Sequence, residues 1–211
     1  MQSQAFLFGV MVAEYDSSMA NALHVDLPGF LVRANAEAPV IPDTVARLAY
    51  GLGLVRINIV TGGGPFAAAV FEHDSGRLIA AGANRVVESR CAAAHAEVLA
   101  LSLAQARVGN HDLGAAGLPS HQLVASAEPC MMCLGAVIWS GVRSLVCAAR
   151  TEDVVAIGFD EGVRTKDWIA ELQARGIAVT TDVQRAESRA LLAEYRAAGG
   201  AIYNARGADR R

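Results

Sequence analysis

Apolar side chains recur at helical spacing between residues 44 and 60, and Asp43 precedes them in the position of a helix cap. Gly51 and Gly53 weaken this pattern without ending it. The pattern predicts a helix over 44–60 with apolar positions at Val45, Leu48, Ala49, Leu52, Val55 and Ile59. Residues 27–42, which precede it, contain three prolines, and we expect a mostly irregular lead-in there.

The run Gly62-Gly63-Gly64-Pro65 breaks the chain after this helix, and strand-like and helix-like segments then alternate. A turn at 73–76 joins the first two strands into a hairpin. The predicted strands are 66–72, 77–85, 121–127, 143–149 and 177–181. The predicted helices are 93–108, 130–140, 152–157, 165–175 and 186–198. This order predicts an α/β fold in which one mixed sheet is covered by helices on both faces.

Length and composition are typical of one domain with extensions. The chain has 211 residues, of which 53% are hydrophobic, so a sizeable core can form without disulfide bonds. We assign residues 1–42 to an N-terminal extension, 43–206 to a single domain and 207–211 to a short tail.

The N-terminus contains a short apolar run at residues 5–13, followed by the small residues Ala20-Asn21-Ala22. This resembles a secretory signal only weakly, because no Lys or Arg precedes the run and the run is too short to span a bilayer. An alternative is that translation starts at Met19. We therefore expect a cytoplasmic protein without membrane association.

The charge balance bears on possible partners. The net charge is -3, and a protein that follows a long phosphate backbone needs a basic face, so we expect no nucleic acid partner. Four cysteines in a chain of this length do not indicate a disulfide scaffold. Cys91 and Cys147 are interpreted as ordinary buried thiols.

Candidate chemistry is concentrated in two short motifs. One is His95-Ala96-Glu97, early in a predicted helix, and the other is Pro129-Cys130-Met131-Met132-Cys133, at the start of another. Cysteines three residues apart on a first helical turn share nearly one face, and the helix terminus favours their thiolate form. One imidazole and two thiolates supply three zinc ligands and leave a fourth position open, which is typical of catalytic zinc.

Glu97 follows the proposed ligand His95 by two residues, so on a helix it points in a different direction. We interpret it as a proton shuttle beside a water that the zinc activates. Two plainer interpretations are a redox-active Cys-x-x-Cys pair and a structural zinc site. The first is disfavoured by the filler residues, and the second by the lack of a fourth Cys or His at comparable spacing.

Residues 65 to about 206 resemble the cytidine deaminase superfamily. The resemblance rests on Ala94-His95-Ala96-Glu97 and on the segment 128–136, which match the zinc deaminase signature. Within the superfamily, Ile157-Gly158-Phe159-Asp160-Glu161 and Ala201-Ile202-Tyr203-Asn204 are most similar to the small zinc-dependent guanine deaminases. The resemblance implies a three-layer α/β/α sandwich around a five-stranded sheet. It also implies one Zn²⁺ per chain and a homodimer that exchanges C-terminal segments.

The resemblance also implies roles for residues around a bound base. It implies that Asn84 hydrogen-bonds the base, that the Ala96 backbone contacts it, and that Glu161 is a second acidic contact. Phe66 and Trp139 would shape the pocket. Plainer alternatives are that both aromatics are core residues, that Asn84 belongs to a turn, and that Glu161 is a solvated loop carboxylate.

The resemblance assigns Tyr203 to the tail beyond Gly199-Gly200, where it would close the partner's site. The alternative is that the tail packs on its own subunit.

The expected reaction is the hydrolysis of guanine to xanthine and ammonia, in which zinc activates the water and Glu97 moves protons. Glu161 would recognise the N–H edge of guanine. The alternatives are deamination of an amino-triazine such as ammeline, of a cytosine compound or of tRNA adenosine. A zinc protein without activity that serves assembly is a further alternative, which the retained Glu97 disfavours.

Overall fold

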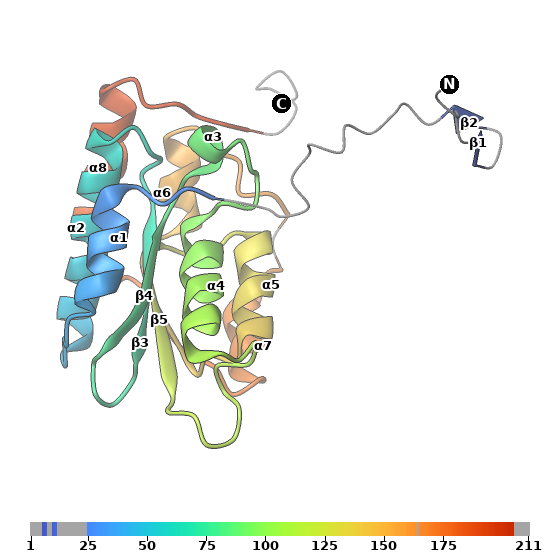
Figure 1. The fold of residues 1–211 in the computed structure, drawn as a ribbon. Coiled ribbons are helices and arrows are strands. Elements are labelled where there is room, and N and C mark those ends of the chain that lie inside the picture. The colour runs from blue at the N-terminus through green and yellow to red at the C-terminus, as the bar shows by residue number, and fades with distance from the viewer. Residues whose placement is uncertain (1–5, 8–9, 12–24, 164, 205–211) are drawn as a thin grey trace.

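The computed structural model describes residues 6–7, 10–11, 25–163 and 165–204. Figure 1 shows its main body, in which helices cover both faces of one sheet. Two short strands, β1 (Phe6–Leu7) and β2 (Val10–Met11), pair antiparallel near the N-terminus. Among the described residues, no helix is both long enough and apolar enough to cross a bilayer.

The central sheet has five strands in the order β4-β3-β5-β6-β7. The hairpin of β3 (Ala67–Glu72) and β4 (Leu78–Ala83) is antiparallel, and β3 also runs antiparallel to β5 (His121–Ala127). The strands β6 (Ser144–Ala149) and β7 (Ala178–Thr180) then add in parallel. The sheet is therefore mixed, as the order of elements predicts.

One helical layer consists of α1 (Gly29–Glu37), α2 (Thr44–Val60) and α8 (Arg185–Ala197), and the opposite layer of α4 (Ala96–Val108), α5 (Met131–Ser140) and α7 (Trp168–Gln173). The short helices α3 (Val86–Ser89) and α6 (Thr151–Ala156) lie in connections. Strands β4, β5 and β6 are buried along their whole length, so each contributes to the cores on both faces. The predicted three-layer α/β/α sandwich is confirmed.

The predicted helix 44–60 is present with the same bounds, and the Asp43 carboxylate accepts a hydrogen bond from the Ala46 amide at 2.8 Å. Gly51 lies where an added Cβ would be 3.9 Å from the Val124 side chain, so this glycine faces the sheet at close range. Packing against the sheet stabilises the helix despite its glycines.

The prediction of an irregular lead-in over 27–42 is wrong for nine residues. Residues 29–37 form α1, which begins directly after Pro28 and packs Phe30, Leu31 and Ala34 into the core. Proline is compatible with a helix start, so the prolines bracket this helix and do not prevent it. Helix α1 therefore packs into the same core cluster as α2.

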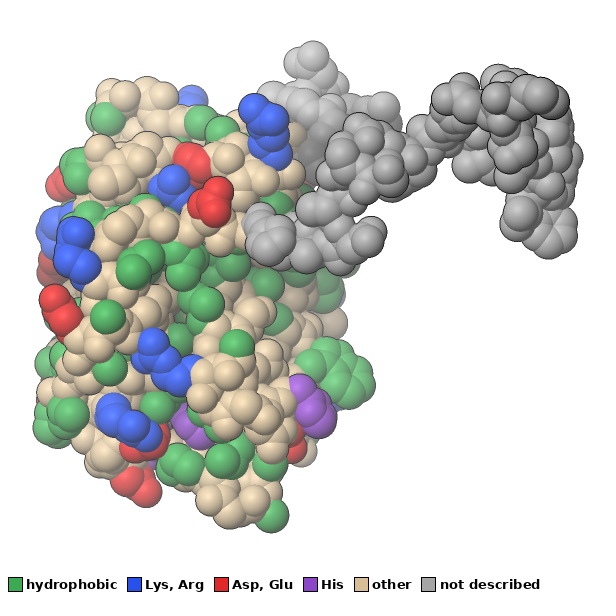
Figure 2. Space-filling model, in the orientation of Figure 1, with side chains coloured by type: hydrophobic (Ala, Val, Ile, Leu, Met, Phe, Trp, Pro, Cys, Tyr) green, Lys and Arg blue, Asp and Glu red, His purple; other side chains and the backbone are tan. Residues whose placement is uncertain are grey.

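The face of the molecule seen in Figure 2 carries basic and acidic side chains interspersed, with hydrophobic side chains between them.

Several connections between strands and helices lie at one end of the strands of the sheet. Strand β3 begins at this end, and β4, β5 and β6 end there. Segments distant in sequence therefore meet at this end of the sheet.

Candidate active site

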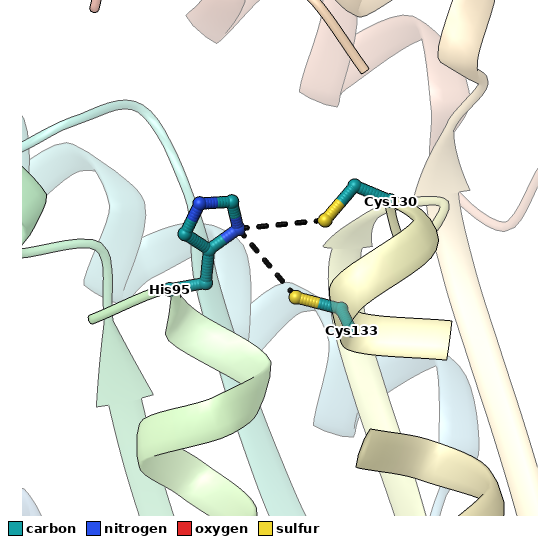
Figure 3. Close-up of side chains that lie close together, drawn as sticks. All are labelled: His95, Cys130 and Cys133. Atoms are coloured by element: carbon teal, nitrogen blue, oxygen red, sulfur yellow. Dashed lines mark hydrogen bonds between the residues drawn. The ribbon is translucent and has the colours of Figure 1, made fainter. Parts of the chain in front are cut away.

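Three potential metal ligands meet at the N-termini of two helices. His95 is the residue before α4, and Cys130 is the residue before α5, with Cys133 in the first turn of α5. The His95 Nδ1 atom lies 3.6 Å from the Cys130 Sγ and 3.5 Å from the Cys133 Sγ (Figure 3). All three ligand atoms lie within 4.8 Å of one another.

These separations fit a tetrahedral zinc ion. Zinc bonds of about 2.3 Å to sulfur and about 2.05 Å to nitrogen, at a tetrahedral angle, place the two atoms about 3.6 Å apart. The histidine and two cysteines therefore have both the donor chemistry and the spacing for zinc. They fill three of its four positions and leave one for water.

Thiolates bind zinc more strongly than thiols, and the electrostatics of the pair favour the charged form at one sulfur. A hydrogen bond from Cys133 is the main cause that lowers the pKa of Cys130 to about 4. The same hydrogen bond and burial raise the pKa of Cys133, because the pair shares one proton. A bound dication favours the thiolate form of both sulfurs.

Glu97 lies in the first turn of α4 and is 8% exposed. Burial raises the pKa of its carboxyl, and the nearby Cys130 charge acts in the same direction. Its side chain lines the same cavity as His95 and Cys130. A carboxyl with a raised pKa beside a metal site is suited to accept and return protons near neutral pH.

The cavity has a volume of about 520 Å³, which is ample for a purine base. The sequence-predicted residues Phe66, Asn84, Glu161 and Tyr203 all line it together with Glu97. Asn84 is 2% exposed and follows directly after β4. The backbone and side-chain geometry thus brings together residues that lie up to 137 positions apart in the chain.

Two predicted pocket residues are placed differently. Trp139 is 83% exposed near the end of α5, and it is not among the residues that line the cavity in the described chain. Ala96 is the first residue of α4, with its side chain 1% exposed in the core below the cavity. A contact between the Ala96 backbone and a base stays a prediction.

Phe159 is a pocket residue whose role the sequence did not indicate. Its ring lies edge-on to Phe66 at 5.3 Å and to Tyr203 at 5.1 Å between ring centroids, and it stacks near Tyr195 at 6.3 Å. The aromatic residue between Gly158 and Asp160 was the available signal. Through its contact with Tyr203, Phe159 packs the loop after α6 against the C-terminal tail.

The tail covers the cavity of its own chain. The Asn204 side chain donates to the Gly158 carbonyl at 3.0 Å and accepts from the Asp160 amide at 2.9 Å, beside the Glu161 position. Burial raises the pKa of the Tyr203 hydroxyl, whereas a hydrogen bond with Asn84 acts in the opposite direction. Within this single chain the tail thus packs against the cavity of the same chain, and an exchange of C-terminal segments between subunits stays a prediction.

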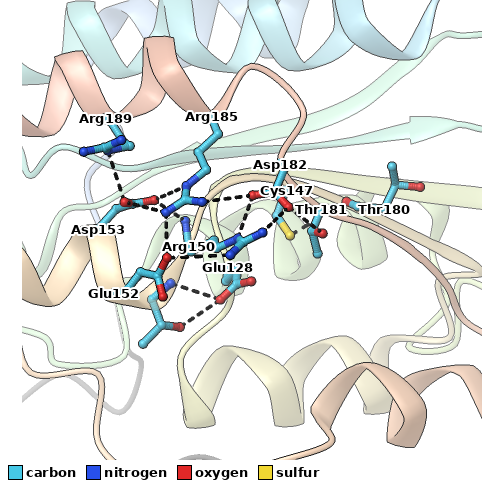
Figure 4. A network of polar contacts seen from close by, with 11 residues as sticks. Glu128, Cys147, Arg150, Glu152, Asp153, Thr180, Thr181, Asp182, Arg185 and Arg189 are labelled. Atoms are coloured by element: carbon cyan, nitrogen blue, oxygen red, sulfur yellow. Dashed lines mark hydrogen bonds and ion pairs between the residues drawn. The ribbon is translucent and has the colours of Figure 1, made fainter.

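A polar network joins Glu128, which lines the cavity, to residues of α6 and α8 (Figure 4). Glu128, directly before the Pro129-Cys130 segment, accepts hydrogen bonds at 3.0 Å from both the amide and the hydroxyl of Thr151, the first residue of α6. Because α6 leads into the Gly158–Glu161 loop, this contact joins the metal-ligand segment to the loop that carries Glu161.

Comparisons with known proteins agree with this geometry. Residues 58–149 match the family model described as cytidine and deoxycytidylate deaminase zinc-binding region. A Bacillus subtilis guanine deaminase is 40% identical over 105 residues, which span 50% of this chain and 63% of that enzyme.

Solved structures extend the similarity over nearly whole chains. The guanine deaminase of Nitrosomonas europaea is 65% identical, with 85% of this chain and 98% of that chain covered and a TM-score of 0.84. A crystal structure of a mutant protein in complex with 8-azaguanine is also 65% identical in sequence. The match covers 84% of this chain and 98% of that chain, with a TM-score of 0.83.

The sandwich fold, the His-Cys-Cys cluster and the adjacent glutamate define a zinc-dependent deaminase of the cytidine deaminase superfamily. Within that superfamily, the chain belongs to the family of the guanine deaminases.

Proposed function

We propose that this protein hydrolyses guanine to xanthine and ammonia, with one zinc ion held by His95, Cys130 and Cys133. The observation that carries the proposal is the buried Glu97 carboxyl, which lines a base-sized cavity together with two of these ligands. The high identity to a guanine deaminase over almost its whole length, and a related structure with 8-azaguanine, support guanine as the base.

The reaction adds water at C2 of guanine and breaks the bond between C2 and the exocyclic nitrogen. A zinc ion held by His95, Cys130 and Cys133 would lower the pKa of the attacking water. Glu97 accepts a proton from that water, delivers it to a ring nitrogen, and helps to protonate the departing amine. One water is consumed, and one ammonia leaves.

We assign recognition of the base to the cavity walls. Glu161 accepts from the N–H edge of guanine, and Asn84 hydrogen-bonds the base from the opposite segment, after β4. Phe66 and Tyr203 enclose the ring and exclude water.

We further propose that the protein is a homodimer. The exposed surface of α5 carries Met131, Met132 and Trp139, which are 40%, 41% and 83% exposed. Apolar side chains grouped on one helix are a typical interface feature, with aromatic and methionine residues enriched. Trp139 would then meet a second copy of the chain. A cytoplasmic location stays a prediction from the sequence.

Ammonia release from a panel of bases tests the proposed substrate. Purified protein with about one zinc per chain should deaminate guanine in preference to cytosine, cytidine, adenine and ammeline. The variant Glu161→Gln should lose most guanine turnover and keep its zinc, because an amide presents a donor to the N–H edge. Preferred turnover of cytidine or ammeline would reject guanine and leave the zinc chemistry intact.

A further inference from the structure

Asn58 lies in the last turn of α2, behind the cavity wall that carries Asn84, and is fully buried. Its side-chain amide donates to the Gly64 carbonyl at 2.8 Å and to the Asn84 carbonyl at 3.0 Å. Arg85 donates to the Asn58 Oδ1 atom at 3.1 Å. Because a guanidinium only donates, this contact fixes the amide orientation, with its nitrogen toward the two carbonyls.

The glycine run after α2 is shaped around this side chain. A Cβ added at Gly63 would lie 2.3 Å from the Asn58 Oδ1, and its three nearest atoms all belong to the Asn58 side chain. Gly63 has no left-handed backbone angle, so its need for glycine arises from this close approach. A Cβ at Gly64 would similarly lie 2.8 Å from the Asn84 Oδ1.

The backbone at Asn84 is held between the cavity and the metal ligands. Its amide donates to the Phe66 carbonyl at 2.9 Å, and the next amide, of Arg85, donates to the Ala94 carbonyl at 2.9 Å, directly before His95. The Asn84 carbonyl accepts from Asn58 and, at 3.3 Å, from the Gly64 amide. Asn58 therefore supplies the side-chain contact that ties α2 to this backbone.

We infer that Asn58 is a positioning residue that sets the Asn84 side chain for its contact with the base. It does not line the cavity, so it acts through Asn84 and through the Gly63-Gly64 turn. The inference rests on the proposed role of Asn84 in base binding. A merely structural Asn58 would affect stability and leave the affinity for the base unchanged.

The test uses Asn58→Asp in the full-length zinc protein. Aspartate keeps the shape and the Oδ1 acceptor for Arg85 but loses the donor to both carbonyls. We expect the zinc content to be kept, the KM for guanine and the Kd for 8-azaguanine to rise roughly tenfold, and kcat to change less, because one base contact is misplaced. Thr61→Val is the matched control, since in the described part of the chain its hydroxyl donates to two carbonyls of the same helix end and to no group of the cavity.

A double-mutant cycle separates positioning from structure. In an Asn84→Ala background, Asn58→Asp should raise KM by less than about twofold, because the side chain that it positions is gone. Gly63→Ala, which displaces Asn58, should reproduce the rise in KM. The inference is overturned if Asn58→Asp and Gly63→Ala both leave KM unchanged, or if both fail to fold. It is also overturned if the changes in binding free energy caused by Asn58→Asp and Asn84→Ala are additive in the double variant.

A different result would contradict the proposed function itself. In that case the wild-type protein would neither deaminate guanine nor bind 8-azaguanine.

Discussion

The active-site residues differ in how closely their local sequence specifies their role. Cys130 and Cys133 lie three residues apart at the start of α5, whereas His95 lies 35 residues before Cys130, at the start of α4. The fold brings the two helix starts together, so that the three ligand atoms lie within 4.8 Å of one another. Glu97 follows His95 by two residues and is not part of the ligand cluster, but its side chain lines the same cavity. The position of a residue at the start of a helix thus determines whether its side chain can bind the metal or transfer protons.

Replacing Glu97 with glutamine should separate metal binding from proton transfer. The amide keeps the size of the side chain but cannot carry a proton between water and base. We expect zinc to stay bound and kcat to fall about 10²–10⁴-fold, as measured by ammonia release and elemental analysis. Glu187→Gln, at the exposed ion pair with Arg56, is the control and should keep normal turnover. Normal kcat in Glu97→Gln would move the proton route to another group.

At the scale of elements, ion pairs between helices hold the loop that carries Glu161. The Asp153 carboxylate on α6 accepts from Arg185 on α8 at 2.7 and 2.9 Å, and from the Arg150 amide at 2.9 Å (Figure 4). The hydrogen bond from Arg185 is the main cause that lowers the pKa of Asp153. These contacts join α6 to α8.

Asp153→Asn should therefore lower the free energy of unfolding by about 1–2 kcal/mol near neutral pH. Because the folded pKa is below the ordinary value of 3.8, this contribution is present above that value and is lost as the pH falls through the folded pKa. Urea denaturation should show the two proteins converging below about pH 4. Glu152→Gln removes a 65%-exposed partner of the same arginine and should change the free energy by less than about 0.5 kcal/mol. An equal deficit at every pH would contradict this account.

At the scale of the whole molecule, the C-terminal tail returns to its own cavity. The Tyr195 hydroxyl donates to the Ala201 carbonyl at 2.7 Å, and the Tyr195 ring lies where a Cβ at Gly200 would be 2.3 Å away. Gly199 has a φ of 76°, a conformation that glycine adopts at little cost. These features turn the chain back after α8.

Truncation after Gly200 removes Tyr203 and Asn204 and should reduce kcat/KM for guanine at least tenfold with zinc retained. If the tail covers the site of the same chain, as it does in the single chain, mixing truncated chains with full-length Glu97→Gln chains should restore no turnover. Truncation after Asn204 keeps the described contacts and should remain active. Recovery of activity in the mixture would instead establish exchange of tails between subunits.

We expect the exposed apolar face of α5 to form the interface of the proposed homodimer. Trp139→Glu places a charge in the proposed apolar interface and should shift the purified protein from dimer to monomer in sedimentation velocity. Val45→Glu changes a valine that is 49% exposed in the first turn of α2 and should leave the dimer intact. A wild-type monomer at micromolar concentration would reject the homodimer.

The sequence by itself determined the order of the strands and helices from residue 44 onward, apart from the short helix α3, together with the mixed sheet and the two metal-ligand motifs. Each of these depends on local spacing, since hydrophobic period and helix position act over a few residues. The five predicted strands and the helix at 44–60 correspond to elements of the structure for this reason.

Only the tertiary structure decided which distant residues share the cavity. Residues 29–37 are helical because their apolar face packs against the sheet, and the prolines on either side lie outside the helix and are compatible with its ends. Phe159 became a pocket residue through contacts with Phe66 and Tyr203, and Trp139 faces outward because α5 turns its other side to the core. The direction in which a side chain points, and the surface on which the C-terminal tail packs, depend on residues far away in the sequence. Local spacing carries no information about those contacts.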